Sequence, residues 1–272
     1  MGQTQPTSGF HTKNIAGSNV DWLVSALDAQ EANDGVRRLR AWAYDAVAAR
    51  PGERAVDIGC GTGSQTRALA TAVTADGEAL GIEPNPGLRA VAEERSAAAG
   101  IKARFADGDA LALALPDASV DVVWCERVLQ HLLEPQRAVD EMARVLRPGG
   151  RVVLLDTDWA TTILHPGEPE TIAALTSGAL TSAANPYAGR KLLGQLSAAG
   201  LTVDDRGSQA LMQDHTAVTW PLIRMLAGSA LRRELITEAQ RDRLYADLTE
   251  AAEHGALHMS VTMFAVAAHR PD

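Results

Sequence analysis

Three glycines stand at alternate positions in the run Val56-Asp57-Ile58-Gly59-Cys60-Gly61-Thr62-Gly63. An apolar stretch precedes the glycines and a helix-forming stretch begins near Ser64, so the glycines lie where a strand turns into a helix. Glycine bends the backbone sharply and lets a ligand approach it closely. The free N–H groups at the start of the helix favour a carboxylate or another anion. The run therefore predicts a ligand-binding loop.

Two common nucleotide-binding loops do not match this spacing. A P-loop needs Gly-Lys followed by Ser or Thr at the helix start, and this chain has Gly63-Ser64-Gln65 there. A dinucleotide-binding loop needs a third glycine where Ser64 or Thr66 stands, which fits only if a side chain is tolerated. The pattern that remains is G-x-G-x-G with Asp57 two residues before it.

Glu83 adds a second observation. It closes the second apolar stretch, about 20 residues beyond the glycines. A carboxylate at the end of that strand can accept hydrogen bonds from both hydroxyls of a ribose. The loop and Glu83 together are much more specific than the loop alone.

Residues 51–157 resemble the ubiquinone- and menaquinone-biosynthesis-like branch of the class I S-adenosylmethionine-dependent methyltransferases. The matching segments, in the expected order, are Val56–Gly63, Gly108–Ala110, Pro116–Val123, Arg127–His131 and Arg144–Gly150. One departure is Leu113-Ala114, where the family usually has Leu-Pro; the proline follows only at position 116. This departure leaves the shape of that loop undetermined, but it does not change the cofactor that the resemblance implies.

The resemblance implies S-adenosylmethionine as the cofactor and names the residues that would bind it. Those expected along its methionine half, mainly through backbone groups, are Gly59, Cys60, Gly61, Cys125, Glu126 and Arg127. Asp57 either contacts the cofactor or orients the glycine loop.

The adenosine half has its own set of implied contacts. Glu83 should hold the ribose, with Pro84 and Asn85 flanking the adenosine. Asp109 should accept from the adenine amine, while the N–H of Ala110 donates to the ring. Carboxylates suit such hydroxyl and amine donors.

Methyl transfer from a sulfonium is an in-line displacement, so positioning supplies most of the acceleration. A general base helps where the acceptor must lose a proton. His131, which follows the fourth apolar strand, is the candidate base; the alternative is that it shapes the pocket.

Three residues after the fifth strand are candidates for acceptor binding. Trp159 either forms a wall for an apolar acceptor or is a buried structural residue. Arg190, which follows Gly189 at the start of a predicted helix, either holds a carboxylate of the acceptor or lies on the surface. Tyr187 is a further acceptor-binding candidate, with packing as its alternative.

Acidic residues at two strand ends raise the question of a metal. Glu126 with Asp156 or Asp158 could bind magnesium, as in metal-dependent catechol methylation. Carboxylates at the rim of a sheet are more often solvated or used as caps, so we expect no metal.

Short apolar strands alternate with amphipathic helices through the first half of the chain. The expected strands are 54–58, 79–82, 103–105, 120–125, 151–155, 201–203 and 258–268. The expected helices are 20–27, 36–47, 64–73, 88–98, 135–146, 172–180, 190–199, 217–231 and 238–254. Near-continuous apolar strands between helices indicate a parallel sheet covered on both faces. The resemblance implies a Rossmann-like α/β fold of seven strands, mostly parallel with one antiparallel.

The pattern changes after residue 159. We therefore expect a single domain over residues 1–272, with an N-terminal helical lid (1–50), a cofactor-binding core (51–157) and a substrate-binding elaboration with closing strands (158–272).

Composition narrows the class of partner. The chain has 272 residues, 46% of them hydrophobic, and a net charge of −9 without a basic cluster. A nucleic-acid partner is disfavoured because nothing is set to neutralise phosphates. The start of the chain is polar, no stretch is apolar enough to span a membrane, and the two cysteines form no CxxC pair, so we expect a cytoplasmic protein.

The expected function is methyl transfer to oxygen, nitrogen or carbon of a small molecule. The Ala- and Arg-rich composition suggests a GC-rich bacterial genome and secondary metabolism. The alternatives are a protein that binds the cofactor but catalyses another reaction, such as a cyclisation, or a non-enzymatic binding module. The oligomeric state, monomer or homodimer, stays open.

Overall fold

The computed structural model describes residues 20–182, 184–213 and 221–272. Seven strands form one sheet in the order β3-β2-β1-β4-β5-β7-β6, and β7 runs in the opposite direction to the other six. The strands are β1 (Arg54–Ile58), β2 (Glu78–Ile82), β3 (Arg104–Ala106), β4 (Val120–Glu126), β5 (Leu146–His165), β6 (Thr202–Met212) and β7 (His258–His269). The fold expected from the resemblance is confirmed.

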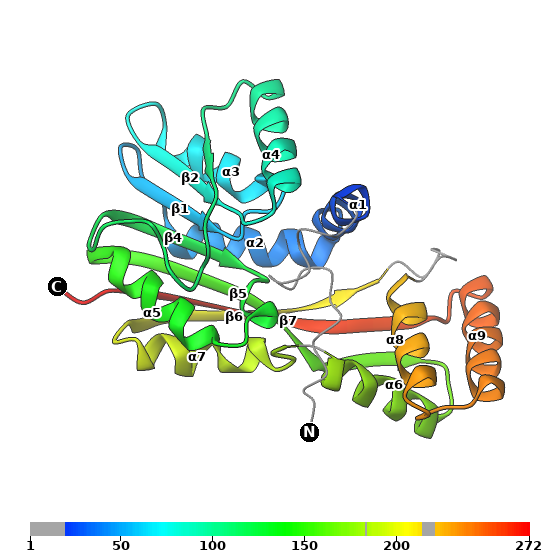
Figure 1. Cartoon of the computed structure of the whole chain (residues 1–272). Coiled ribbons are helices and arrows are strands. Elements are labelled where there is room, and N and C mark those ends of the chain that lie inside the picture. The colour runs from blue at the N-terminus through cyan, green and yellow to red at the C-terminus, as the bar shows by residue number, and fades with distance from the viewer. Residues whose placement is uncertain (1–19, 183, 214–220) are drawn as a thin grey trace.

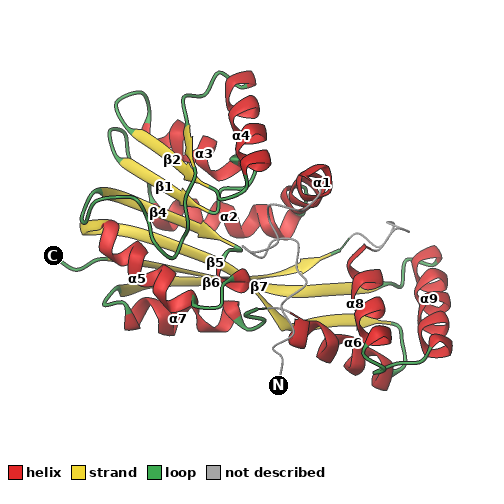
Figure 2. Cartoon of the chain, viewed as in Figure 1, coloured by secondary structure: helices red, strands yellow, loops and turns green. Residues whose placement is uncertain are grey.

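Helices cover both faces of the sheet (Figures 1 and 2). They are α1 (Val20–Glu31), α2 (Asp34–Val47), α3 (Ser64–Val73), α4 (Pro86–Ala98), α5 (Pro135–Val145), α6 (Pro169–Ser182), α7 (Ala188–Ala198), α8 (Pro221–Arg232) and α9 (Glu238–Glu253). One apolar core lies between the sheet and α5 with α7, and a second lies between the opposite face and α2 with α3. Strand β4 is buried along most of its length because both cores press on it.

Two strands are much longer than the local pattern predicts. Strand β5 continues beyond Leu155 to His165, and β6 continues beyond Val203 to Met212. The antiparallel strand β7 pairs with both extensions, so distant pairing rather than local periodicity sets their length. A bulge between Asp158 and Ile163 interrupts the pairing of β5 and hides the continuation in the sequence.

A third apolar core surrounds the far ends of these strands. It joins residues of β5 and β7 to α6, α8 and α9, and includes Leu175, Leu226, Leu244 and Leu248. The far ends of β5 and β7 together with α6, α8 and α9 therefore form a second lobe (Figure 1). The helix expected over 217–231 begins within the described residues at Pro221, and its first positions lie outside them.

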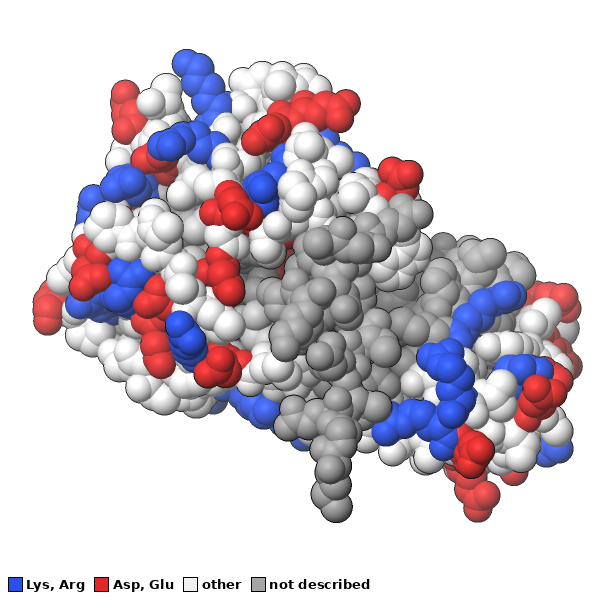
Figure 3. Space-filling model, in the orientation of Figure 1, with Lys and Arg blue, Asp and Glu red and all other residues white. Residues whose placement is uncertain are grey.

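Acidic and basic side chains are intermixed on the face shown in Figure 3. Among the described residues, no helix is both long and apolar enough to cross a membrane.

Candidate cofactor and acceptor site

The glycine loop turns sharply from β1 into α3. Gly59 and Gly61 have φ of 70° and 53°, a region that favours glycine. The N–H of Gly59 donates to the carbonyl of Ile82 (2.8 Å), which draws the loop onto the end of β2. A Cβ at Gly59 would lie 2.3 Å from Cγ2 of Val128, in the segment that follows β4. The loop thus brings together the carboxyl ends of β1, β2 and β4.

Glu83 meets this loop at the end of β2. Its carboxylate accepts from the N–H of Gly61 (3.0 Å) and the N–H of Asn85 (2.9 Å). The residue is 6% exposed. Burial raises the pKa of the Glu83 carboxyl, although the two backbone donors oppose the shift. Pro84 follows it, and Asn85 caps α4 by accepting from Gly87 N–H (2.8 Å).

Asp57 lies beneath the loop. Its carboxylate accepts from the hydroxyl of Thr66 (2.7 Å) and so ties β1 to α3. Burial raises the pKa of Asp57 to about 7. The contact gives Asp57 a loop-orienting role, while direct contact with the cofactor stays a prediction.

A buried ionic network lies at the end of β4. Arg40 of α2 donates from Nε and Nη2 to the two oxygens of Glu126 (2.9 and 2.8 Å). Arg127 donates to the same carboxylate (3.2 Å) and has a φ of 56°. Burial alone would raise the pKa of Glu126, but the guanidinium groups of Arg40 and Arg127 hold it below its usual value. Two cations thus share one anion beside the glycine loop.

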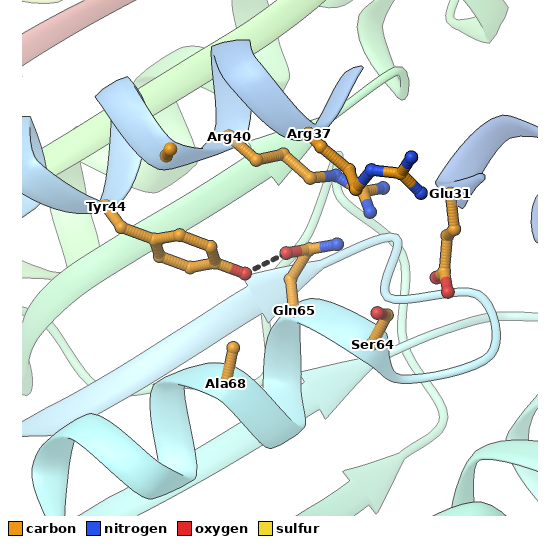
Figure 4. Close-up of a pocket in the computed structure, with 8 residues that line it drawn as sticks. Glu31, Arg37, Arg40, Tyr44, Ser64, Gln65 and Ala68 are labelled. Atoms are coloured by element: carbon orange, nitrogen blue, oxygen red, sulfur yellow. Dashed lines mark hydrogen bonds between the residues drawn. The ribbon is translucent and has the colours of Figure 1, made fainter. Parts of the chain in front are cut away.

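An open hollow of about 340 Å³ lies between α2 and the start of α3 (Figure 4). Its lining residues are Glu31, Arg37, Arg40, Ala41, Tyr44, Ser64, Gln65 and Ala68. The Gln65 amide lies between the Tyr44 hydroxyl and the Arg40 guanidinium, whose Nη1 is 2.8 Å away. With its oxygen toward Arg40, this amide accepts from the guanidinium and donates to Tyr44.

Three other predicted cofactor residues lie near the strand ends. Asp109 is exposed and accepts from the N–H of Leu111 (2.9 Å), and Ala110 beside it is buried. The Cys125 side chain belongs to the core between the sheet and α5. Burial raises the pKa of the Cys60 and Cys125 thiols well above their usual value, so both cysteines stay protonated.

The segment after β4 meets the middle of β5. His131 ends a short 3-10 helix, Leu129–His131, and Trp159 donates from Nε1 to the side-chain oxygen of Gln130 (2.8 Å). Asp156 accepts from the backbone N–H of Gln130 (3.1 Å) and is fully buried. Burial raises the pKa of Asp156 to about 7, against the pull of its backbone donors.

Arg190 and Tyr187 form a pair at the start of α7. The Arg190 guanidinium lies 5.0 Å from the centre of the Tyr187 ring. It also donates to the buried carboxylate of Asp158 (2.9 Å). Arg190 is half-exposed, so it can still reach a ligand outside the protein core.

Residues 56–154 match the family described as "Methyltransferase domain". This chain carries a class I S-adenosylmethionine-dependent methyltransferase domain.

Relatives of the methyltransferase domain cover part of the chain. It is 33% identical over 131 residues to demethylmenaquinone methyltransferase of Bacillus cytotoxicus, covering 47% of this chain and 55% of that protein. It is 40% identical over 145 residues to an uncharacterized 37.1 kDa protein in transposon TN4556 of Streptomyces fradiae, covering 53% and 41%. The chain thus spans about half the length of the curated relatives it matches.

A solved structure shares the fold over the whole chain. The cyclase SpnF is 19% identical with a TM-score of 0.59, covering 99% of both chains.

The methyltransferase domain therefore gathers most of the predicted cofactor residues on one edge of the sheet. The N–H of Gly61 donates to the Glu83 carboxylate, and the N–H of Gly59 donates to the carbonyl of Ile82, the residue before Glu83. The acceptor candidates Trp159, Tyr187 and Arg190 lie together where the bulge of β5 meets the start of α7.

The carboxylates considered for magnesium have other partners in the methyltransferase domain. Glu126 binds two arginines, and Asp158 binds Arg190. Within residues 20–182, 184–213 and 221–272, no group of three or more His, Cys, Asp or Glu side chains is placed to hold a metal ion.

The sequence argument missed Arg40 and Gln65. Arg40 reaches Glu126 across 86 positions of the chain, and nothing in the local pattern of α2 marks it. Gln65 stands in the first turn of α3, directly after the glycine loop. Its position beside Ser64 was the one feature of the sequence that could have marked it as a site residue.

Proposed function

We propose that this protein transfers the methyl group of S-adenosylmethionine to oxygen, nitrogen or carbon of a small-molecule acceptor. The observation that carries the proposal is the Glu83 carboxylate, held at the glycine loop by the Gly61 N–H at 3.0 Å. A buried carboxylate beside a bare backbone loop fits a ribose with two hydroxyl donors. The domain match and the name of the Bacillus relative support the same reaction class.

The residues of the chain bind and orient the reactants. S-adenosylmethionine supplies a methyl group already activated on a positively charged sulfur. Gly59 to Gly61 would lie along its methionine half, and the guanidinium groups of Arg40 and Arg127 would face its carboxylate. By holding the acceptor in line with this methyl group, these residues would supply most of the acceleration.

We place the acceptor between the end of β4 and the bulge of β5, facing the second lobe. Trp159, Tyr187 and Arg190 would contact it, and His131 is the candidate base where the acceptor must lose a proton. In this proposal, residues 51–157 bind the cofactor, residues 1–50 cover it, and residues 158–272 select the acceptor. The composition supports an acceptor from bacterial secondary metabolism.

The first test is calorimetric titration with S-adenosylmethionine and S-adenosylhomocysteine. Glu83→Ala should weaken binding by about 1–3 kcal/mol, because the hydroxyl donors of the ribose lose a charged acceptor. Glu78→Ala, at the opposite end of β2, is the matched control and should bind as the wild type does.

Product analysis separates the proposed reaction from its alternatives. A methyltransferase must release one S-adenosylhomocysteine for each methylated acceptor. A cyclase would convert its substrate without releasing any. Absence of binding to both ligands in the wild type would contradict the proposal.

A further inference from the structure

Helix α1 lies across the glycine loop and the start of α4. A Cβ at Gly61 would be 3.0 Å from Cδ1 of Leu27, so Leu27 sits directly against the loop. A Cβ at Gly87 would be 2.5 Å from Cγ2 of Val20, so the other end of α1 sits against the start of α4. Seven residues of helix span about 10 Å. Helix α1 therefore bridges the two loops that the proposed function assigns to the cofactor.

An ion pair fastens this helix at one point. Arg95 of α4 donates from both Nη atoms to the two oxygens of Asp28 (2.6 and 2.9 Å). The Asp28 side chain is 45% exposed and that of Arg95 is 32% exposed, so solvent can reach the pair. The Arg95 guanidinium lowers the pKa of Asp28, which keeps this carboxylate charged.

All the charged side chains of α1 are acidic. The helix carries Asp21, Asp28 and Glu31 and no basic residue. Glu31 acts electrostatically on Arg67 and Arg95, which belong to α3 and α4. The acidic helix thus faces arginines of the two helices that flank the glycine loop.

Two predicted cofactor residues bonded to the loops that α1 contacts are closed off from solvent. Glu83 is 6% exposed and Asn85 is 2% exposed. Helix α1 contacts Gly61, whose N–H binds Glu83, and Gly87, whose N–H binds Asn85, so α1 is placed to control access to both residues.

We propose that the Asp28–Arg95 pair is a latch that holds α1 over the cofactor and sets the rate at which the cofactor enters and leaves. The proposal rests on the proposed function only in taking the glycine loop as the cofactor site. Asp28 and Arg95 act through Leu27 and Val20 and are positioning residues, not catalytic ones.

A latch present in both the free and the bound closed state has a distinctive kinetic effect. Weakening it speeds opening in both states, so the association and dissociation rates rise together while Kd changes little. Loss of a direct ligand contact would instead raise the dissociation rate and Kd. The two mechanisms can therefore be told apart.

The experiment measures S-adenosylhomocysteine binding by stopped-flow fluorescence. Asp28→Asn should raise both rate constants about two- to five-fold, the range expected for an exposed ion pair. Added salt should speed the wild type and leave Asp28→Asn nearly unchanged, since screening acts on the pair. The charge-swapped variant Asp28→Arg with Arg95→Asp should return the rates toward the wild type.

Asp34→Asn is the matched control. It removes the same charge from an exposed pair with Arg37 on α2, and its rates should equal those of the wild type. Binding with unchanged rates in Asp28→Asn, or a rise in Kd equal to the rise in dissociation rate, would overturn the latch alone. Absence of binding in the wild type would overturn the proposed function and the latch with it.

Discussion

Gly59 shows how closely a single residue position is constrained. Its φ of 70° favours glycine, and an added Cβ would lie only 2.3 Å from Cγ2 of Val128. Gly59→Ala must therefore adopt a left-handed conformation and also push Val128 aside. We expect it to lower the free energy of unfolding by about 2–4 kcal/mol and to weaken cofactor binding.

Gly100→Ala separates the two effects. Gly100 has a φ of 65° with open space around it, so alanine there adds only the backbone strain, about 1 kcal/mol. Urea denaturation of both variants measures the difference. Equal losses in the two would mean that contact with Val128 contributes nothing.

Asp57 makes stability depend on pH. Its pKa is about 7 in the folded protein and about 3.9 in an unfolded chain. Between these values the folded state binds more protons, so the contribution of Asp57 to the free energy of unfolding falls as pH rises. Asp57→Asn does not titrate, and its amide can still bond to Thr66.

The wild type should therefore lose about 1–3 kcal/mol relative to Asp57→Asn between pH 5 and pH 8. Urea denaturation at the two pH values measures this difference. Asp156 titrates in a similar range but is present in both proteins, so it cancels. A difference that does not change with pH would show that Asp57 is already ionised at pH 5.

At the scale of elements, the sequence predicted what local pattern and glycine spacing determine. Strand β1 and helix α3 have the predicted bounds. The glycine loop determines where β1 ends and where α3 begins. The ends of β5 and β6 were not predictable, since they depend on pairing with β7 about 100 residues away from β5. No local sequence pattern indicates that β5 continues past its bulge, because the continuation depends on pairing with β7.

Interactions between elements were the least predictable part of the site. Arg40 on α2 binds Glu126 on β4, and Leu27 on α1 rests against Gly61. Neither contact follows from a motif, because each joins a helix before the core to a strand end within it. The motif predicted the Gly61–Glu83 neighbourhood because both residues follow adjacent parallel strands.

On the scale of the whole molecule, the long strands β5 and β7 join two regions with separate cores. Leu69 of α3, the helix that follows the glycine loop, is buried in the core between α2, α3 and the sheet, and Leu248 of α9 is buried in the second lobe. Each Leu→Ala change should lower the free energy of unfolding by about 2–5 kcal/mol. Only Leu69→Ala should also weaken S-adenosylhomocysteine binding. The proposed cofactor contacts come from the segments that follow β1, β2, β3 and β4, and α3 begins directly after the first of these.

Calorimetric titration of the two variants at a temperature where both are folded measures this separation. Leu248→Ala should leave binding unchanged, because the cavity that the substitution creates lies in the core with α6 and α8, away from β1 and β2. If Leu248→Ala binds as weakly as Leu69→Ala, the second lobe shapes the cofactor site through β5. The assignment of residues 158–272 to the acceptor alone would then be wrong.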